Sequence, residues 1–107
     1  YSGEDGIILP LMSLGGLGVI SVAANIIPRQ VHDLCAAALN GDYEKARELQ
    51  FAINPLVDAL FCEVSPTPVK AALYKMGMIE EVLRLPLISM TDGARAKPHI
   101  EMAKFGL

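Results

Sequence analysis

The chain has 107 residues, a net charge of −3 and an apolar fraction of 52%. Its length allows one domain with a modest core, and so apolar a composition predicts that part of the surface packs against further protein. Because the sequence carries no basic stripe, nucleic acids and anionic membranes are poor candidates as partners. Cys35 and Cys62 have no CxxC spacing and form no metal-ligand pattern with the two histidines, which predicts free thiols, no metal and a reducing cytoplasm.

The opening 25 residues predict a βαβ unit whose first strand is mostly missing. Residues 7–14 predict a short apolar helix, for which Asp5 stands in the N-cap position. Residues 18–22 (GVISV) are β-branched and apolar on both faces, as in a buried parallel strand. Residues 6–28 carry no charge, but the prolines and glycines within them divide the run, which disfavours a membrane span.

Two helices follow the predicted strand. Pro28 opens the first, because a missing N–H costs little there, and Asn40-Gly41 ends it. Asp42 can cap the second helix, which is predicted over residues 43–61 with a kink just before Pro55. The second helix has an apolar inner face made of Ala46, Leu49, Ile53, Leu56 and Leu60.

Two more helices complete the chain, with no further strand between them. Thr67 and Pro68 form a favourable N-cap and first position for the next helix. Thr91 can begin a last helix that reaches Phe105, unless Pro98 kinks it or marks a later start. The order is therefore βαβ and then helices only, which indicates a helical appendage that follows a completed α/β sheet.

Few residues carry a recognisable chemical pattern. Gly3, Glu4 and Asp5 lie where a strand gives way to a helix, so they can border a ligand pocket, although the carboxylates can equally favour the helix N-terminus. The glycines at 15–18 precede a strand, which is the reverse of a phosphate-binding loop. Lys70 has apolar neighbours, but such a lysine more often keeps its amine in water than forms a Schiff base.

Four segments carry a family resemblance, in order along the chain: 1–5 (YSGED), 18–25 (GVISVAAN), 63–70 (EVSPTPVK) and 83–87 (LRLPL). They resemble the end of the seventh strand, the eighth strand with its loop, and two tail segments of the dihydrodipicolinate synthases (4-hydroxy-tetrahydrodipicolinate synthases). Ser65 departs from the usual Asn of the third segment.

The resemblance implies a (β/α)8 TIM barrel followed by an all-helical domain. Residues 1–41 would be the last βαβα portion of the barrel, and residues 42–107 the C-terminal helical domain. Among the site residues, Ile20 matches the position whose main chain helps to bind pyruvate. Gly3 matches a backbone position beside the substrate pocket, and Glu4 and Asp5 match an acidic pair near its mouth.

The resemblance also implies the chemistry of a Schiff-base lyase. Such an enzyme condenses pyruvate with aspartate semialdehyde in lysine and diaminopimelate biosynthesis, in the cytoplasm, without a cofactor and as a homo-oligomer. The Schiff-base lysine and the tyrosine relay precede Tyr1 in the family, and neither Lys70 nor Tyr1 matches them. The chain by itself is therefore expected to contain no catalytic residue and to be inactive.

Two alternatives remain open. N-acetylneuraminate lyases and keto-deoxy-sugar aldolases share the barrel and the Schiff base but use another aldehyde. Residues 26–107 can instead form a helical assembly module without chemistry, which pairs with a second copy through its apolar surface.

Overall fold

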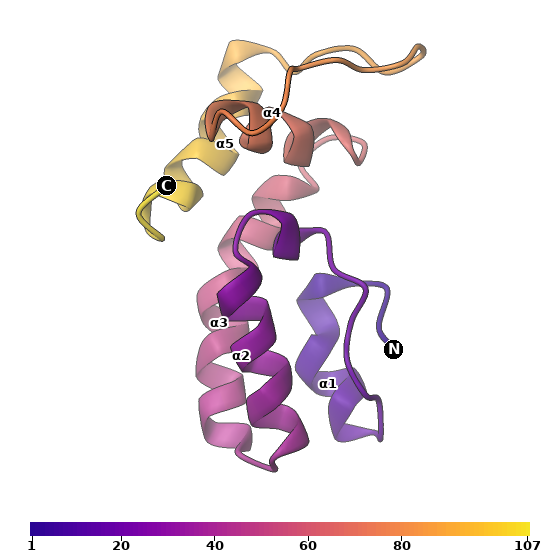
Figure 1. Ribbon diagram of the computed structural model, residues 1–107, viewed down its shortest axis with the longest axis vertical. Helices are drawn as coiled ribbons and strands as arrows, with labels where there is room; N and C mark the ends of the chain where they lie inside the picture. Colours follow the sequence, from indigo (N-terminus) through magenta and orange to yellow (C-terminus); the bar gives the residue numbers. More distant parts are fainter.

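The computed structural model describes all residues from Tyr1 to Leu107. The molecule is mostly helical and elongated, with extents of 41 × 27 × 21 Å. It forms two groups of helices, one above the other in Figure 1. The elements in chain order are the 3-10 turn η1 (Asp5–Ile7), α1 (Ile8–Ser13), the 3-10 turn η2 (Ala23–Asn25), α2 (Pro28–Leu39), α3 (Tyr43–Leu60), α4 (Thr67–Lys75) and α5 (Asp92–Ala103).

The lower group consists of α1, α2 and α3. Helices α2 and α3 lie side by side, joined by a tight turn, and α1 packs against both of them (Figure 1). Their facing sides supply most of the core, because each helix is amphipathic and buries its apolar stripe against the others. The fully buried large side chains of this core are Ile8, Leu34, Ile53, Leu56 and Leu60.

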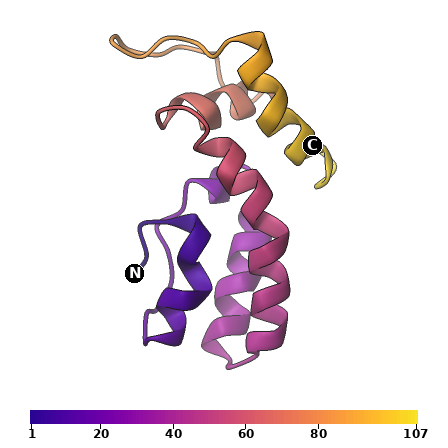
Figure 2. The ribbon, with the colours of Figure 1, turned by 180° about the vertical axis from the view of Figure 1, so that it is seen from behind.

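The upper group consists of α4, α5 and the long segment 76–91 that connects them. Figure 2 shows this segment as an irregular excursion that projects beyond the helices. Helix α5 packs against both α4 and α3, and its Met102 is fully buried in the common core. The two groups therefore share a single apolar core.

Several helix boundaries agree with the sequence-based prediction. Pro28 occupies the first turn of α2, and Gly41, with φ of +77°, lies just beyond the end of this helix. The Asp42 side chain accepts a hydrogen bond from the Lys45 backbone N–H at 3.2 Å, which caps α3. The Thr91 hydroxyl accepts one from the Ala94 N–H at 3.3 Å, which caps α5. These caps satisfy donors that the first turn of a helix leaves free.

Other boundaries were predicted incorrectly. Asp5 does not cap a helix that begins next to it, because its carboxylate is directed elsewhere. Thr67 is the first residue of α4, Pro66 occupies the N-cap position and no side chain caps the helix. Thr67 is buried and lies one position inside the helix, beyond the N-cap.

The two helix-internal prolines do not interrupt their helices. Helix α3 runs through Pro55, and α5 runs through Pro98 and ends at Ala103, before Phe105. Each proline removes one backbone donor, but packing on both sides can hold the helix together across that position. Pro98 itself is fully buried, which supplies such packing.

The predicted strand 18–22 is not a strand in this chain. A single parallel β-bridge joins Ser2 to Val19, and no other residues form a ladder. A β-ladder grows only where two extended segments lie side by side over several residues. In this chain only the first few residues, around Ser2, lie beside residues 18–22. The parallel direction agrees with the predicted βαβ unit, while the complete barrel and the division at residues 41 and 42 stay predictions.

None of the helices combines the length and the apolar composition that crossing a bilayer requires.

Candidate functional site

The predicted site residues lie around the only sheet-like contact in the chain. The Ser2 N–H donates to the Gly18 carbonyl at 2.8 Å, and the Ile20 N–H donates to the Ser2 carbonyl at 2.9 Å. These alternating bonds are those of two parallel strands. Both segments therefore end at the same side, and the turns that follow them, at residues 3–7 and 21–25, are neighbours.

The first of these turns is fixed by Ser2. Its side chain is almost completely buried, and the hydroxyl both donates to the Glu4 carbonyl at 2.8 Å and accepts from the Glu4 N–H at 3.0 Å. Serine is well suited to this role, since one hydroxyl can donate to a backbone carbonyl and accept from a backbone N–H of the residue two positions later. The turn thereby directs Glu4 outward and Asp5 inward.

Asp5 connects the two turns. Its side chain is 1% exposed, and Oδ2 accepts from the backbone N–H groups of Val22 and Ala23, each at 3.0 Å. Hydrogen bonds to an ionised acceptor contribute about 1.5–3 kcal/mol each, which offsets part of the cost of burying the charge. The second carboxylate oxygen of Asp5, Oδ1, is buried and has no hydrogen-bond partner within this chain.

The charge of Asp5 also acts on a cysteine of α2. Burial raises the pKa of the Cys35 thiol, and the nearby Asp5 carboxylate raises it further. Both effects favour the protonated thiol, so Cys35 is a poor nucleophile. Cys62 is exposed, and neither cysteine forms a disulfide.

Gln50 is a buried polar residue that the sequence-based prediction missed. Its side chain lies in the middle of α3, is 4% exposed, and donates to the Asp5 carbonyl at 3.0 Å and to Asn54 Oδ1 at 2.8 Å. Its own oxygen accepts from the Leu9 N–H at 3.0 Å. The signal was present in the sequence, because Gln50 interrupts the apolar stripe that Ala46 and Ile53 share with it.

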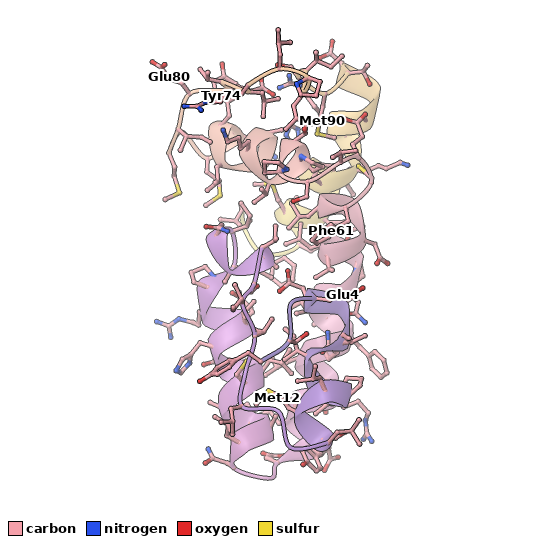
Figure 3. The ribbon with its side chains drawn as sticks, turned by 90° about the vertical axis from the view of Figure 1, so that its right-hand side faces the viewer. Glu4, Met12, Phe61, Tyr74, Glu80 and Met90 are labelled. Carbon is pink, nitrogen blue, oxygen red and sulfur yellow. The ribbon has the colours of Figure 1, made fainter.

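Gly3 and Glu4 border an open groove of about 410 Å³ between the first turn and the C-terminal end of α3. Figure 3 shows Glu4 and Phe61 on the same side of the molecule, one above the other. Two carboxylates and one aromatic ring give the groove an acidic, partly apolar lining. Its complete lining is Gly3, Glu4, Gly6, Val57, Asp58 and Phe61.

Ile20 lies apart from this groove. Its side chain is 78% exposed, and only its backbone N–H is engaged, in the bond to Ser2. The structure therefore places Gly3 and Glu4 on the groove, buries Asp5 beside them and leaves the Ile20 side chain exposed. Their predicted contacts with substrate stay predictions.

The remaining candidate residues are occupied in other ways. Lys70 Nζ donates to the Val82 carbonyl at 2.9 Å, which ties α4 to the long connection. His32 is exposed, with Nδ1 3.1 Å from Asp33 Oδ1. No group of three or more histidine, cysteine or acidic side chains is arranged to hold a metal ion.

The sequence and the fold both match one known family. The sequence model of the Dihydrodipicolinate synthetase family matches residues 1–103. The chain belongs to this family. Among the relatives of the family, the 4-hydroxy-tetrahydrodipicolinate synthase of a Thermoanaerobacter species is 52% identical over 107 residues, and that of Caldicellulosiruptor bescii is 53% identical over 107 residues. Each alignment covers all of this chain and 36% of the relative.

Solved structures of the dihydrodipicolinate synthetase family have the same fold over this segment. The dihydrodipicolinate synthase of Aquifex aeolicus superposes with a TM-score of 0.97 at 44% identity, over all of this chain and 36% of that one. The enzyme of Thermotoga maritima gives a TM-score of 0.96 at 42% identity, over 99% of this chain and 36% of that one. The chain thus spans little more than a third of the length of its relatives.

Proposed function

We propose that the chain is the carboxy-terminal part of a 4-hydroxy-tetrahydrodipicolinate synthase. The observation that carries this proposal is the 52% identity to a relative of that name over the whole of the chain. In the complete protein, pyruvate and aspartate semialdehyde would be condensed to 4-hydroxy-tetrahydrodipicolinate in the cytoplasm, without a cofactor. The four segments with family resemblance support the same assignment.

In this proposal residues 1–41 complete a (β/α)8 barrel and residues 42–107 form a helical domain beside it. The parallel bridge between Ser2 and Val19 supports the barrel, because parallel neighbours separated by a helix are its repeating unit. Further support comes from apolar side chains that are exposed in this chain. Leu14 is 90% exposed and Ile20 78%, as expected of side chains that meet additional strands and helices.

The site residues of this chain would line one part of the active site. Active sites of barrels lie at the carboxyl ends of the strands, which is where both turns described above are found. Ile20 would contribute its main chain to pyruvate binding, Gly3 would allow close approach of substrate, and Glu4 would lie at the mouth of the pocket. Asp5 would complete the acidic pair of that mouth from below.

The covalent chemistry would come from residues outside this chain. A lysine amine adds to the keto carbon of pyruvate and water leaves, which forms a Schiff base; its enamine then attacks the aldehyde. Lys70 is a poor substitute, since its amine is exposed and donates to the Val82 carbonyl. The 107-residue chain is therefore expected to be inactive by itself.

Trapping with pyruvate and borohydride tests this proposal. The complete protein should gain one reduced pyruvyl adduct, and its Lys70→Arg variant should gain the same adduct. The 107-residue chain should remain unlabelled. An adduct on Lys70 would contradict the assignment. So would a complete protein that prefers another aldehyde to aspartate semialdehyde and forms N-acetylneuraminate or a keto-deoxy sugar from it and pyruvate.

We further propose a homo-oligomeric parent protein. The exposed apolar side chains of the upper group, which include Tyr74, Leu85 and Ile88, support an additional protein contact. Light scattering on the complete protein is the measurement, and a strictly monomeric mass would overturn this part of the proposal.

A further inference from the structure

The short turns around the proposed site receive no side-chain cap from their own N-cap residues. In η1, α1 and η2 the N-cap residue makes no side-chain hydrogen bond. Turns this short bury too little surface to be stable alone, and their first N–H groups need acceptors. Ser21 supplies one acceptor locally, since its hydroxyl accepts from the Ala24 N–H at 2.9 Å. The acceptors for the Val22, Ala23 and Leu9 N–H groups come from residues far away in sequence.

Asp5 supplies the acceptor for the second turn. Its Oδ2 receives the N–H groups of Val22 and Ala23, the first donors of η2, across 17 and 18 residues of sequence. These two donors lie two and three residues after Ile20 in the chain. The position of the Ile20 backbone is thus determined on one side by its bond to Ser2 and on the other by the bonds to Asp5.

Gln50 holds Asp5 in turn. Its amide donates to the Asp5 carbonyl at 3.0 Å, and its oxygen accepts from the Leu9 N–H, one of the first donors of α1. One side chain from the middle of α3 therefore fastens both the turn that carries Asp5 and the helix that follows it. Because Gln50 and Asp5 are both almost fully buried, water competes weakly for these bonds.

We propose that Asp5 and Gln50 form a buried clamp that positions the Ile20 main chain for pyruvate. This inference rests on the proposed function, and it assigns Asp5 a role different from contact with substrate. Asp5 acts directly on the loop after Ile20, and Gln50 acts through Asp5. Small displacements of a binding group have large effects on the reacting geometry, so the loss of the clamp should weaken pyruvate binding selectively.

Steady-state kinetics of the complete protein test the clamp. Asp5→Ala should raise KM for pyruvate by about tenfold or more, while KM for aspartate semialdehyde changes by less than about threefold. Asp5→Asn retains an acceptor oxygen and should restore KM for pyruvate to within about threefold of the parent value. Gln50→Met, which keeps the shape of the side chain, should give a smaller rise than Asp5→Ala because its effect on the loop is indirect.

Met102→Ala is the matched control for lost stability. Met102 is fully buried in α5 and lies in the same core, but it makes no bond to either turn. This variant should lower Tm and leave KM for pyruvate unchanged. Hydrogen exchange gives a second readout that does not depend on activity, since the Val22 and Ala23 amides should exchange faster in Asp5→Ala and not in Met102→Ala.

The outcomes separate this inference from the proposed function. A parent protein without condensing activity would refute the proposed function. An active parent in which Asp5→Ala lowers Tm but leaves KM for pyruvate unchanged would refute the clamp alone. If Asp5→Ala does not fold, the Gln50→Met variant tests the clamp instead. An unchanged KM for pyruvate together with unchanged exchange of the Val22 and Ala23 amides in this variant would refute the clamp.

Discussion

His99 is the histidine whose titration the fold alters. It lies on α5 with Nε2 buried and without a hydrogen-bond partner. Burial lowers the pKa of His99, and the positive charges of Lys75 and Arg95 lower it further. Arg95 is itself held by Glu81, with a distance of 2.8 Å between its guanidinium and the carboxylate. The folded chain therefore favours the neutral imidazole.

This environment predicts an acid-sensitive fold. Because the pKa of His99 is lower in the folded chain than in the unfolded chain, where it is about 6.5, the unfolded chain binds more protons below that pH. The stabilisation is complete above about pH 6.5 and is lost as the pH falls through the folded pKa. The urea midpoints of unfolding at about pH 7.5 and about pH 5.5 should differ less in His99→Gln than in the unsubstituted chain.

His32→Gln is the control for this measurement. His32 is exposed on α2, far from α5 in sequence, so its replacement should leave the acid-dependent fall in stability in place. If the urea midpoint falls equally with pH in the unsubstituted chain and in His99→Gln, groups other than His99 cause the acid sensitivity.

At the scale of single elements, the two aspartates Asp42 and Asp5 show the difference between a hydrogen-bond partner that is near in sequence and one that is distant. Asp42 was correctly predicted to cap α3, because its partner, Lys45, is three residues away and the pattern is visible in the sequence. Asp5 was incorrectly predicted to cap the helix beside it, because its partners lie 17 and 18 residues away. Local propensity cannot reveal a partner that only folding brings near.

Asp42→Ala should destabilise the chain by about 1 kcal/mol, the usual cost of losing a side-chain N-cap. Asp58→Ala is its counterpart within the same helix, since Asp58 is exposed and its side chain makes no hydrogen bond or ion pair here. That variant should change the free energy of unfolding by no more than about 0.5 kcal/mol. Equal losses in the two variants, measured by urea unfolding, would contradict the capping role of Asp42.

At the scale of the whole molecule, the core joins both groups of helices. The apolar face predicted for α3 is largely buried, as Ile53 and Leu56 show with no exposed surface. Leu34 of α2 is fully buried in the same core. Periodicity identifies such faces because 3.6 residues per turn place every third or fourth side chain on one side. It does not tell which other helix covers the face.

Leu34→Ala should reduce the free energy of unfolding by about 2–5 kcal/mol, because it leaves a cavity between α2 and α3. Leu39→Ala, in the same helix, removes the same atoms from a side chain that is 58% exposed, and should cost no more than about 0.5 kcal/mol. Both are measured by urea unfolding. A small loss in Leu34→Ala would mean that the core is not packed as described.

The sequence by itself determined what depends on near neighbours. It identified the helices, the caps at Asp42 and Thr91 and the family, because periodicity, capping patterns and motifs are properties of contiguous residues. Only the tertiary structure decided that Asp5 bonds to Val22 and Ala23, that Gln50 holds Asp5, and that residues 18–22 form a single bridge. Each of these depends on a partner that is distant in sequence, and a buried polar group takes whichever partner the folded chain brings within reach.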